Sequence, residues 1–192
     1  METLLAIGIG IGLASVAGVR AYLPLALFGL FARFGFFELP APFGFMDDWA
    51  AIGAFLVLAL LETGLDKVSS LARIVNIVQT PLRIAAGAVL FALALQEGLN
   101  AGAIPELVAG GVIAGVVAVL KYVLRPSAGA SSAGVSSSFL STFEDVVALV
   151  GGVIAVLVPL LPLLPVAFLL YFFFRIRRRR GKKFGGLRIL GD

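Results

Sequence analysis

Long apolar stretches, separated by short groups of polar and charged residues, make up most of the chain. A helix needs about 20 apolar residues to cross the hydrocarbon core of a bilayer. The stretches therefore predict an all-α, polytopic helical membrane protein with about six transmembrane helices in one domain, residues 1–174. The predicted spans lie at residues 3–34, 49–65, 80–96, 104–124, 141–158 and 166–174.

Helix-breaking residues mark the first and the last of these spans. The first stretch is longer than one crossing and contains Arg20 and Pro24, which predicts a tilted or broken first helix. Proline removes a backbone donor and clashes with the preceding turn. Pro159, Pro162 and Pro165 therefore predict a tight hairpin before a short last span.

The composition supports a membrane environment and excludes several kinds of chemistry. Hydrophobic residues make up 60% of the chain and charged residues 14%, with a mean hydropathy of +1.09; soluble domains are about 45–50% apolar and about 25% charged. The chain has no Cys and no His, which excludes disulfides, thiol nucleophiles, zinc sites built from these residues and imidazole catalysis. We expect no cofactor and no enzymatic activity. A membrane enzyme is the least favoured class of function. Acidic pairs could hold Mg²⁺, but no nucleophile–base or metal motif accompanies them.

Residues 175–192 form a strongly basic tail. They carry a net charge of +7, whereas residues 1–174 carry −3. A basic tail can bind nucleic acid, but directly after an apolar span it is more typical of a cytoplasmic stop signal that contacts anionic lipid headgroups. We therefore expect membrane lipids, and not nucleic acid, as partners. The residues expected to contact headgroups are Arg175, Arg177, Arg178, Arg179, Arg180, Lys182 and Lys183.

The charges between the spans divide according to the positive-inside rule. Six spans and a cytoplasmic tail put residues 66–79 and 121–140 inside, with the basic residues Lys67, Arg73, Lys121 and Arg125. The outside segments then carry Glu38, Asp47, Asp48, Glu97 and Glu106, with Arg33 as the exception. This division predicts that both termini are cytoplasmic. The first residues lack the positive region and cleavage site that would indicate a signal peptide.

Two segments on the predicted inner side have local signals. Residues 66–79 are partly apolar and could form an amphipathic turn of helix in the interface. Thr80 and Pro81 resemble a helix cap and an N1 proline, and Ser141 with Glu144 resembles a capping box, so helices are expected to begin at both places. Residues 125–138 are rich in Ser, Gly and Ala, which is typical of a flexible linker or of a re-entrant loop lining a cavity.

Small residues predict where helices approach each other closely. Gly8 with Gly12 and Gly111 with Gly115 are four residues apart in apolar stretches, a spacing that favours packing within or between subunits. Because small six-span proteins often need a partner to complete a pathway, a homo-oligomer is expected.

Charged residues recur at corresponding places in spans two and three and in spans four and five. In the first unit they are Glu62, Asp66, Lys67 and Arg83; in the second, with the signs exchanged, they are Lys121, Arg125, Glu144 and Asp145. Internal repeats are common in transporters, whose binding sites lie between the repeats. We therefore predict that four helix ends gather around one charged cluster in which opposite charges face each other.

Three of the charged residues are in unfavourable local positions. Glu62 and Asp66 repel each other at i,i+4 and lie near a helix C-terminus, where the dipole disfavours negative charge. Arg20 lies near the middle of the first apolar stretch, where a charge costs about 2.5–3.5 kcal/mol. Each therefore needs compensation, from an opposite charge, a bound ion or, for the acids, a proton.

The motifs of the chain, taken in order, resemble those of one known family. They are Gly18-Val-Arg-Ala-Tyr-Leu-Pro24, Leu30-Phe-Ala-Arg-Phe-Gly35, Glu62-Thr-Gly-Leu-Asp66-Lys67, Thr80-Pro-Leu-Arg83 with Gly87, Lys121 through Arg125, and Ser141-Thr-Phe-Glu144-Asp145. The family is DUF4126, which usually has Asn in place of Arg20, and the resemblance covers about residues 5–165. It implies a small polytopic membrane protein of prokaryotes and plastids, here in the bacterial cytoplasmic membrane, and supplies no settled activity.

Charges placed where lipid would expel them favour a channel or transporter for an ion or small charged solute. Its pathway residues would be Arg20, Glu62, Asp66, Lys67, Arg83, Lys121, Arg125, Glu144 and Asp145. One alternative is a lipid-handling protein that flips or binds a phospholipid or isoprenoid phosphate, with Arg20 and the inner basic residues gripping the phosphate. Another is a scaffold or assembly factor whose charges only tie helices together. A water-accessible cavity lined by these residues would favour the first two functions, and a dry, fully paired cluster would favour the third.

Overall fold

Helices account for all the regular structure in the described part of the chain. The computed structural model describes residues 2–67, 72–96, 103–125 and 137–183, and no strand occurs among them. One 3-10 helix, η1 (Phe43–Asp47), and seven α-helices are present. The α-helices are α1 (Glu2–Val19), α2 (Tyr22–Arg33), α3 (Trp49–Lys67), α4 (Ala72–Ala94), α5 (Ile104–Leu124), α6 (Ser137–Leu157) and α7 (Leu163–Lys183).

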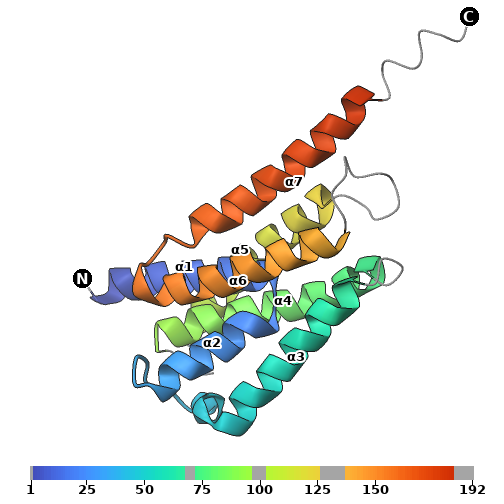
Figure 1. Cartoon of the computed structure of the whole chain (residues 1–192). Coiled ribbons are helices and arrows are strands. Elements are labelled where there is room, and N and C mark those ends of the chain that lie inside the picture. Colours follow the sequence, from blue (N-terminus) through green and yellow to red (C-terminus); the bar gives the residue numbers. More distant parts are fainter. Residues whose placement is uncertain (1, 68–71, 97–102, 126–136, 184–192) are drawn as a thin grey trace, which may run out of the picture.

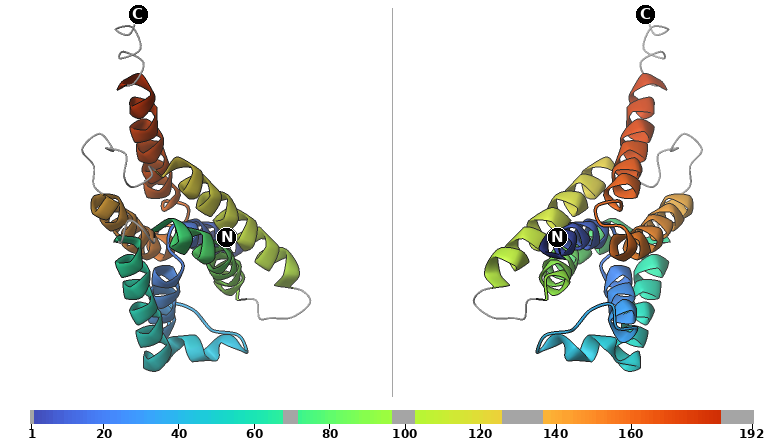
Figure 2. Two further views of the ribbon diagram at one scale, coloured as in Figure 1. Left: turned by 90° about the vertical axis from the view of Figure 1, so that its right-hand side faces the viewer. Right: turned by 90° about the vertical axis from the view of Figure 1, so that its left-hand side faces the viewer.

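Helix α1 lies in the centre of the bundle, with α4 and α6 running roughly along it, whereas α3, α5 and α7 are inclined to it (Figures 1 and 2). Helix α1 packs against α4, α5 and α6, and α2 pairs with α3 beside them. The residues of α1 that face its neighbours are fully buried: Leu13, Ala14, Val16, Ala17 and Val19. Helix α7 starts at the same end of the bundle as α1 and diverges from α1 and α6 along its length, while it contacts the end of α5 (Figures 1 and 2).

Glycines let the central helices approach closely. A Cβ on Gly18 of α1 would lie 2.6 Å from the carbonyl oxygen of Ala114, and one on Gly110 of α5 would collide with the carbonyl oxygen of Gly87 in α4. A Cβ on Gly8 would lie 2.7 Å from Cβ of Pro159, so the predicted Gly8–Gly12 packing face is confirmed. Small residues at such contacts are the common way in which membrane helices associate.

The other predicted glycine pair lies at the surface. Gly111 and Gly115 line a shallow apolar groove between α4 and α5. A Cβ at either position would be in ordinary contact with Ile84, about 3.5 Å away. The pair therefore makes no close approach within the described chain, and its packing between subunits stays a prediction.

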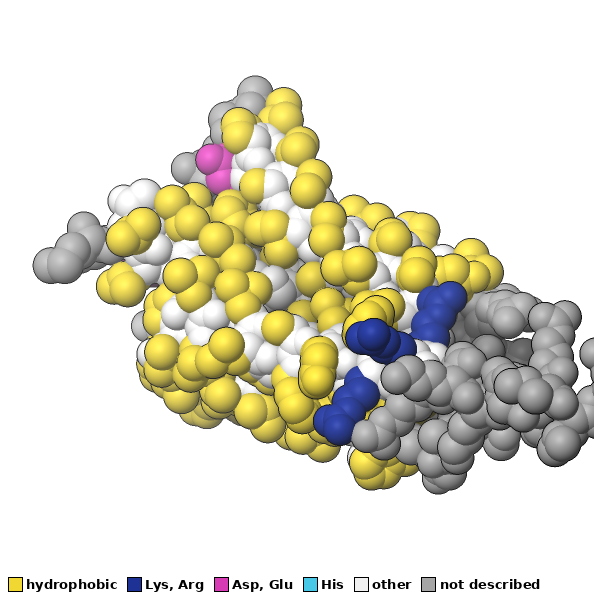
Figure 3. All heavy atoms as spheres, turned by 90° about the horizontal axis from the view of Figure 1, so that it is seen from above, with side chains coloured by type: hydrophobic (Ala, Val, Ile, Leu, Met, Phe, Trp, Pro, Cys, Tyr) yellow, Lys and Arg dark blue, Asp and Glu magenta, His cyan; other side chains and the backbone are white. Residues whose placement is uncertain are grey.

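The outer surface of the bundle is apolar enough for contact with lipid. Hydrophobic side chains cover most of the face in Figure 3, and Lys and Arg gather towards one end of it. By length and composition, four helices could cross a membrane: residues Trp49–Asp66, Val75–Ala94, Ile104–Leu124 and Ser138–Leu157. The all-helical class and its membrane character are thus supported, whereas the count of six spans is not established.

The first predicted span is two helices rather than one. Pro24 has no N–H to continue the ladder of α1, and the chain turns between Val19 and Tyr22 so that α2 runs back along the bundle (Figure 1). A broken first helix is therefore confirmed, but Arg20 lies at the junction rather than in the middle of a span. Because α1 and α2 run in opposite directions, the first and last described residues lie at opposite ends of the bundle (Figure 1). The predicted cytoplasmic location of both termini stays a prediction.

Two predicted helix starts are wrong. Helix α4 begins at Ala72, so that Pro81 lies inside it, and α6 begins at Ser137, before the expected capping box at Ser141. Thr80 Oγ1 donates to the carbonyl oxygen of Asn76 within α4, so it acts inside a continuing helix and not as a cap. Ser141 and Glu144 are buried in contacts with Arg20 and Lys121, which take the place of a capping box. The hairpin at Pro159–Pro165 is confirmed between α6 and α7, although α7 already begins at Leu163.

The predicted loops coincide only partly with the described residues. Residues 72–79 of the expected interfacial segment form the first turns of α4, with Asn76 and Gln79 buried, while 68–71 lie outside the description. Residues 126–136 also lie outside the description, so the choice between a flexible linker and a re-entrant loop for this segment stays open.

Candidate functional site

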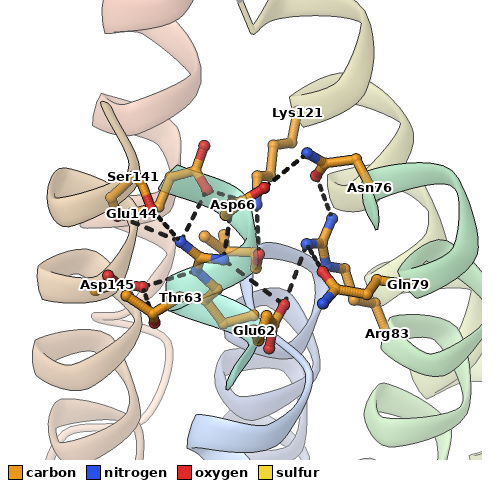
Figure 4. A network of polar contacts seen from close by, with 12 residues as sticks. Glu62, Thr63, Asp66, Asn76, Gln79, Arg83, Lys121, Ser141, Glu144 and Asp145 are labelled. Carbon is orange, nitrogen blue, oxygen red and sulfur yellow. Dashed lines mark hydrogen bonds and ion pairs between the residues drawn. The ribbon is translucent and has the colours of Figure 1, made fainter. Parts of the chain in front are cut away.

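Eight charged side chains meet where α1 turns into α2, close to the ends of α3 and α5 and the beginnings of α4 and α6 (Figure 4). We call this group the charged cluster. Four members are basic and four are acidic, so their formal charges cancel. Six of their residues are at most 2% exposed; the side chains of the other two, Arg125 and Asp145, are 10% and 23% exposed. The members are Arg20, Glu62, Asp66, Arg83, Lys121, Arg125, Glu144 and Asp145.

Arg20 is the centre of the charged cluster. Its Nη1 lies 2.8 Å from Asp66 Oδ2, and its Nε lies 2.8 Å from Asp145 Oδ1. Nη2 donates a hydrogen bond of 2.9 Å to Ser141 Oγ and lies 3.5 Å from Glu144 Oε2. The break after α1 puts this guanidinium between α3 and α6, where five donors in a planar fork can serve several acceptors at once.

Lys121 ties the end of α1 to α5 and α6. Its Nζ donates a hydrogen bond of 2.7 Å to the carbonyl oxygen of Val19 and lies 2.7 Å from Glu144 Oε2. Val19 is the last residue of α1, and its carbonyl is one of those that a helix end leaves without an intrahelical partner. The buried ammonium therefore caps one helix and neutralises a carboxylate on another.

Asp66 is the most completely bonded carboxylate. Arg20 Nη1 donates to Oδ2 at 2.8 Å, Asn76 Nδ2 donates to Oδ1 at 3.1 Å, and Arg125 Nη1 contacts both oxygens at 3.0–3.1 Å. Two guanidinium groups and an amide thus compensate for the unfavourable helix-end position that the sequence indicates.

Helix α4 contributes two polar residues that were not predicted as members of the site, Asn76 and Gln79. Arg83 donates to Asn76 Oδ1 at 3.0 Å, to Gln79 Oε1 at 2.8 Å and to Glu62 Oε1 at 3.1 Å. Asn76, Gln79 and Arg83 follow one another at i, i+3 and i+7, which places them on one helix face. That spacing is the signal in the sequence. It did not lead to a prediction of site residues, because residues 66–79 were expected to form an amphipathic turn of helix in the interface.

Two polar atoms at the inner end of the charged cluster lack partners. Glu62 Oε2 and Arg83 Nε are buried, and neither has a hydrogen-bond partner among the described residues. Native proteins leave few buried polar atoms unsatisfied, and each such atom calls for an explanation.

The structure brings together eight of the nine predicted pathway residues. The ninth, Lys67, ends α3, but its side chain lies outside the description. The prediction that helix ends gather around facing opposite charges is confirmed by the eight ion pairs of 2.7–3.9 Å.

The basic tail is described only in part. Arg175, Arg177 and Arg178 are exposed at the end of α7, and Arg177 Nη1 donates to the carbonyl oxygen of Val123 in α5. The side chains of Arg179, Arg180, Lys182 and Lys183 lie outside the description, so contact with headgroups stays a prediction. No group of three or more acidic side chains in the described residues could hold a metal ion.

An all-helical bundle with an apolar surface and a balanced, buried charged cluster defines the class: a helical protein with the features of an integral membrane protein. The chain belongs to the DUF4126 family, described as a domain of unknown function, whose model matches residues 7–179. A search of the curated proteins and a search of the solved structures each found no match.

Proposed function

We propose that the protein is a channel or transporter for an ion or small charged solute in the bacterial cytoplasmic membrane. The basic end of the bundle faces the cytoplasm, as the positive-inside rule favours. The observation that carries the proposal is a continuous series of side chains of alternating charge. It runs from the basic end into the bundle and ends at an ion pair, Glu62 with Arg83, in which each side chain has a buried atom without a hydrogen-bond partner among the described residues. We call it the charge ladder; it consists of Arg125, Asp66, Arg20, Glu62 and Arg83.

Short contacts link the steps of the charge ladder. Asp66 Oδ2 lies 3.0 Å from Arg125 Nη1 and 2.8 Å from Arg20 Nη1. Glu62 Oε1 lies 3.9 Å from Arg20 Nη1 and 3.1 Å from Arg83 Nη2. At 1.5 Å per helical residue, Glu62 is about 6 Å deeper along α3 than Asp66.

The cost of burial supports a functional role for these charges. Buried ion pairs are often no better for stability than apolar residues of similar volume, and the central helices already pack closely through Gly18, Gly87 and Gly110. Ionisable residues inside a membrane are by default candidates for an ion or substrate pathway. Because six of the eight members of the charged cluster are at most 2% exposed, we interpret the described conformation as a closed state of such a pathway.

A scaffold or assembly role is the second candidate. It is favoured by the burial of most of the charged cluster and by the ion pairing of every member. On this view the only role of the ion pairs is to hold the helices from α1 through α6 together. Lipid handling has less support, because a phosphate headgroup needs access to Arg20, whose side chain is 2% exposed.

A reconstitution experiment separates the two candidates. Purified protein in phosphatidylethanolamine–phosphatidylglycerol vesicles is tested for charge movement under imposed gradients of H⁺, K⁺, Na⁺ and Cl⁻. We expect currents above those of protein-free vesicles and a loss of at least about tenfold in Glu62→Gln, which keeps size and shape while removing the charge. Asp66→Asn is a less clean test, since it disturbs contacts with two guanidinium groups.

The matched control is Glu106→Gln. Glu106 also has a buried Oε2 without a hydrogen-bond partner among the described residues, but it lies in the first turn of α5, at the other end of that helix from Lys121. Its variant should retain the wild-type currents. If the wild type carries no current while Glu62→Gln lowers the stability of the protein, the transport proposal is wrong and the scaffold role stands.

A further inference from the structure

Glu62 differs from the other carboxylates of the charged cluster. Both oxygens of Asp66 accept hydrogen bonds, and each oxygen of Glu144 has a cationic nitrogen within 3.3 Å. Asp145 accepts from Thr63 Oγ1 and keeps 23% of its side chain exposed. Glu144 and Glu62 are both buried and have carboxylate oxygens without a hydrogen-bond partner among the described residues. The two oxygens of Glu144 each face a cation, whereas the ion-pair contacts of Glu62 with Arg20 and Arg83 are both at Oε1, which leaves Oε2 as the oxygen without a described partner.

The surroundings of Glu62 restrict what could bind at its free oxygen. Groups face it from three directions: Arg20 and Tyr22 from the junction of α1 and α2, Arg83 from α4, and Asp66 one turn further along α3. The residue is 2% exposed. The described residues offer no set of acidic side chains that could hold a metal ion. A proton fits, because it occupies no volume and removes the charge that burial penalises.

We propose that Glu62 binds a proton at Oε2 and that this proton is the ion, or the coupling ion, that the protein moves. The proposal rests on the proposed transport function and names its substrate class. Protonation neutralises Glu62, which weakens its attraction to Arg83 and to Arg20 and breaks the charge ladder at its innermost step. The charged cluster then holds an excess of one positive charge, which favours separation of the helices that carry Arg20 and Arg83.

Protonation of Glu62 can be measured without any transport assay. The infrared difference spectrum of the reconstituted protein between high and low pH should contain a band of a protonated carboxyl group that is missing from Glu62→Gln. The band should remain in Glu106→Gln. If the bands of wild type and Glu62→Gln are the same, the proton is not on Glu62 and the proposal is overturned, whatever the vesicles transport.

Proton movement is tested in the same vesicles with a pH-sensitive dye inside. A K⁺ diffusion potential set by valinomycin should acidify the lumen at least about tenfold faster in wild type than in Glu62→Gln, and Glu106→Gln should behave as wild type. Glu62→Asp, which keeps a carboxyl group, should restore part of the rate. Wild-type currents of K⁺, Na⁺ or Cl⁻ without any change of internal pH would overturn the proton proposal and leave the transport function intact. An absence of all currents would remove both.

Discussion

Single residues in the charged cluster have very different numbers of partners, and this sets how much each contributes to stability. Arg20 has ion-pair contacts with all four carboxylates, Glu62, Asp66, Glu144 and Asp145, at 2.8–3.9 Å. Removing one member of a buried ion pair costs about 3–5 kcal/mol, because the other charge stays buried without compensation.

We therefore expect Arg20→Met to be strongly destabilising. It fills similar volume but leaves a net negative charge among four acids, so the free energy of unfolding should fall by at least about 3 kcal/mol. Chemical unfolding in detergent micelles measures the change. The control is Arg33→Gln, since Arg33 is exposed and its described contact is with the Trp49 ring, 5.8 Å from the guanidinium carbon. A loss below about 1 kcal/mol in Arg20→Met would show that Arg20 does not hold the cluster together.

The sequence shows at this scale which residues need partners, but not which partners they find. The repulsion between Glu62 and Asp66 and the burial of Arg20 follow from local spacing, and both indicated missing counter-charges. The pairing of Lys121 with the carbonyl of Val19 does not follow from spacing, because 102 residues separate them and the contact depends on where α1 ends. Asn76 was not predicted as a member of the site for a similar reason. From the sequence alone, an Asn that is buried in a helix cannot be distinguished from an Asn in a loop until its partners are known.

At the scale of helices, the closest contact in the bundle joins α4 and α5, whose residues contact each other more than those of any other pair. On α5 the neighbouring residues Gly110 and Gly111 face different surroundings. A Cβ on Gly110 would collide with the carbonyl oxygen of Gly87 and with Cβ of Phe91, whereas a Cβ on Gly111 would lie 3.5 Å from Ile84.

This difference gives a matched pair of variants. Gly110→Ala should lower the free energy of unfolding by about 1–3 kcal/mol, because overpacking forces α4 and α5 apart. Gly111→Ala should be neutral or stabilising, since Ala has the higher helix propensity. Thermal unfolding of both proteins in the same detergent compares them. Equal effects of the two changes would contradict the described α4–α5 contact.

Helix types were predictable from the sequence, whereas helix boundaries were predictable only where no tertiary contact replaces a cap. The fourth predicted span, 104–124, coincides with α5, which has Pro105 in its first turn and no polar face to bury there. Helices α4 and α6 begin eight and four residues earlier than predicted. In both, the early turns carry Asn76, Gln79 or Ser141, whose side chains bond within the charged cluster.

At the scale of the whole molecule, the division of charge between the two ends of the bundle agrees with the prediction, whereas the path of the first apolar stretch does not. The basic residues that precede the α3–α4 and α5–α6 connections lie at one end of the bundle, and η1 with Asp47 lies at the other (Figure 1). This division of charge follows from the sequence. The N-terminus was predicted on the basic side because one broken span was expected where α1 and α2 form two antiparallel helices. The turn at Arg20 depends on Lys121 and Ser141, so it could not be derived from the first stretch alone.

The orientation can be mapped with single cysteines, because the natural chain has none. The suitable positions are exposed: Thr3, Gly44, Ser138 and Arg178. A membrane-impermeant maleimide should label Thr3→Cys and Gly44→Cys from the periplasmic side of cells, and Ser138→Cys and Arg178→Cys only in inverted vesicles, since the basic end faces the cytoplasm. Labelling of Thr3→Cys from the same side as Ser138→Cys would contradict the pass of α1 along the whole bundle. Labelling of all four with the sides exchanged would leave the fold intact and reverse the proposed direction in which the charge ladder opens.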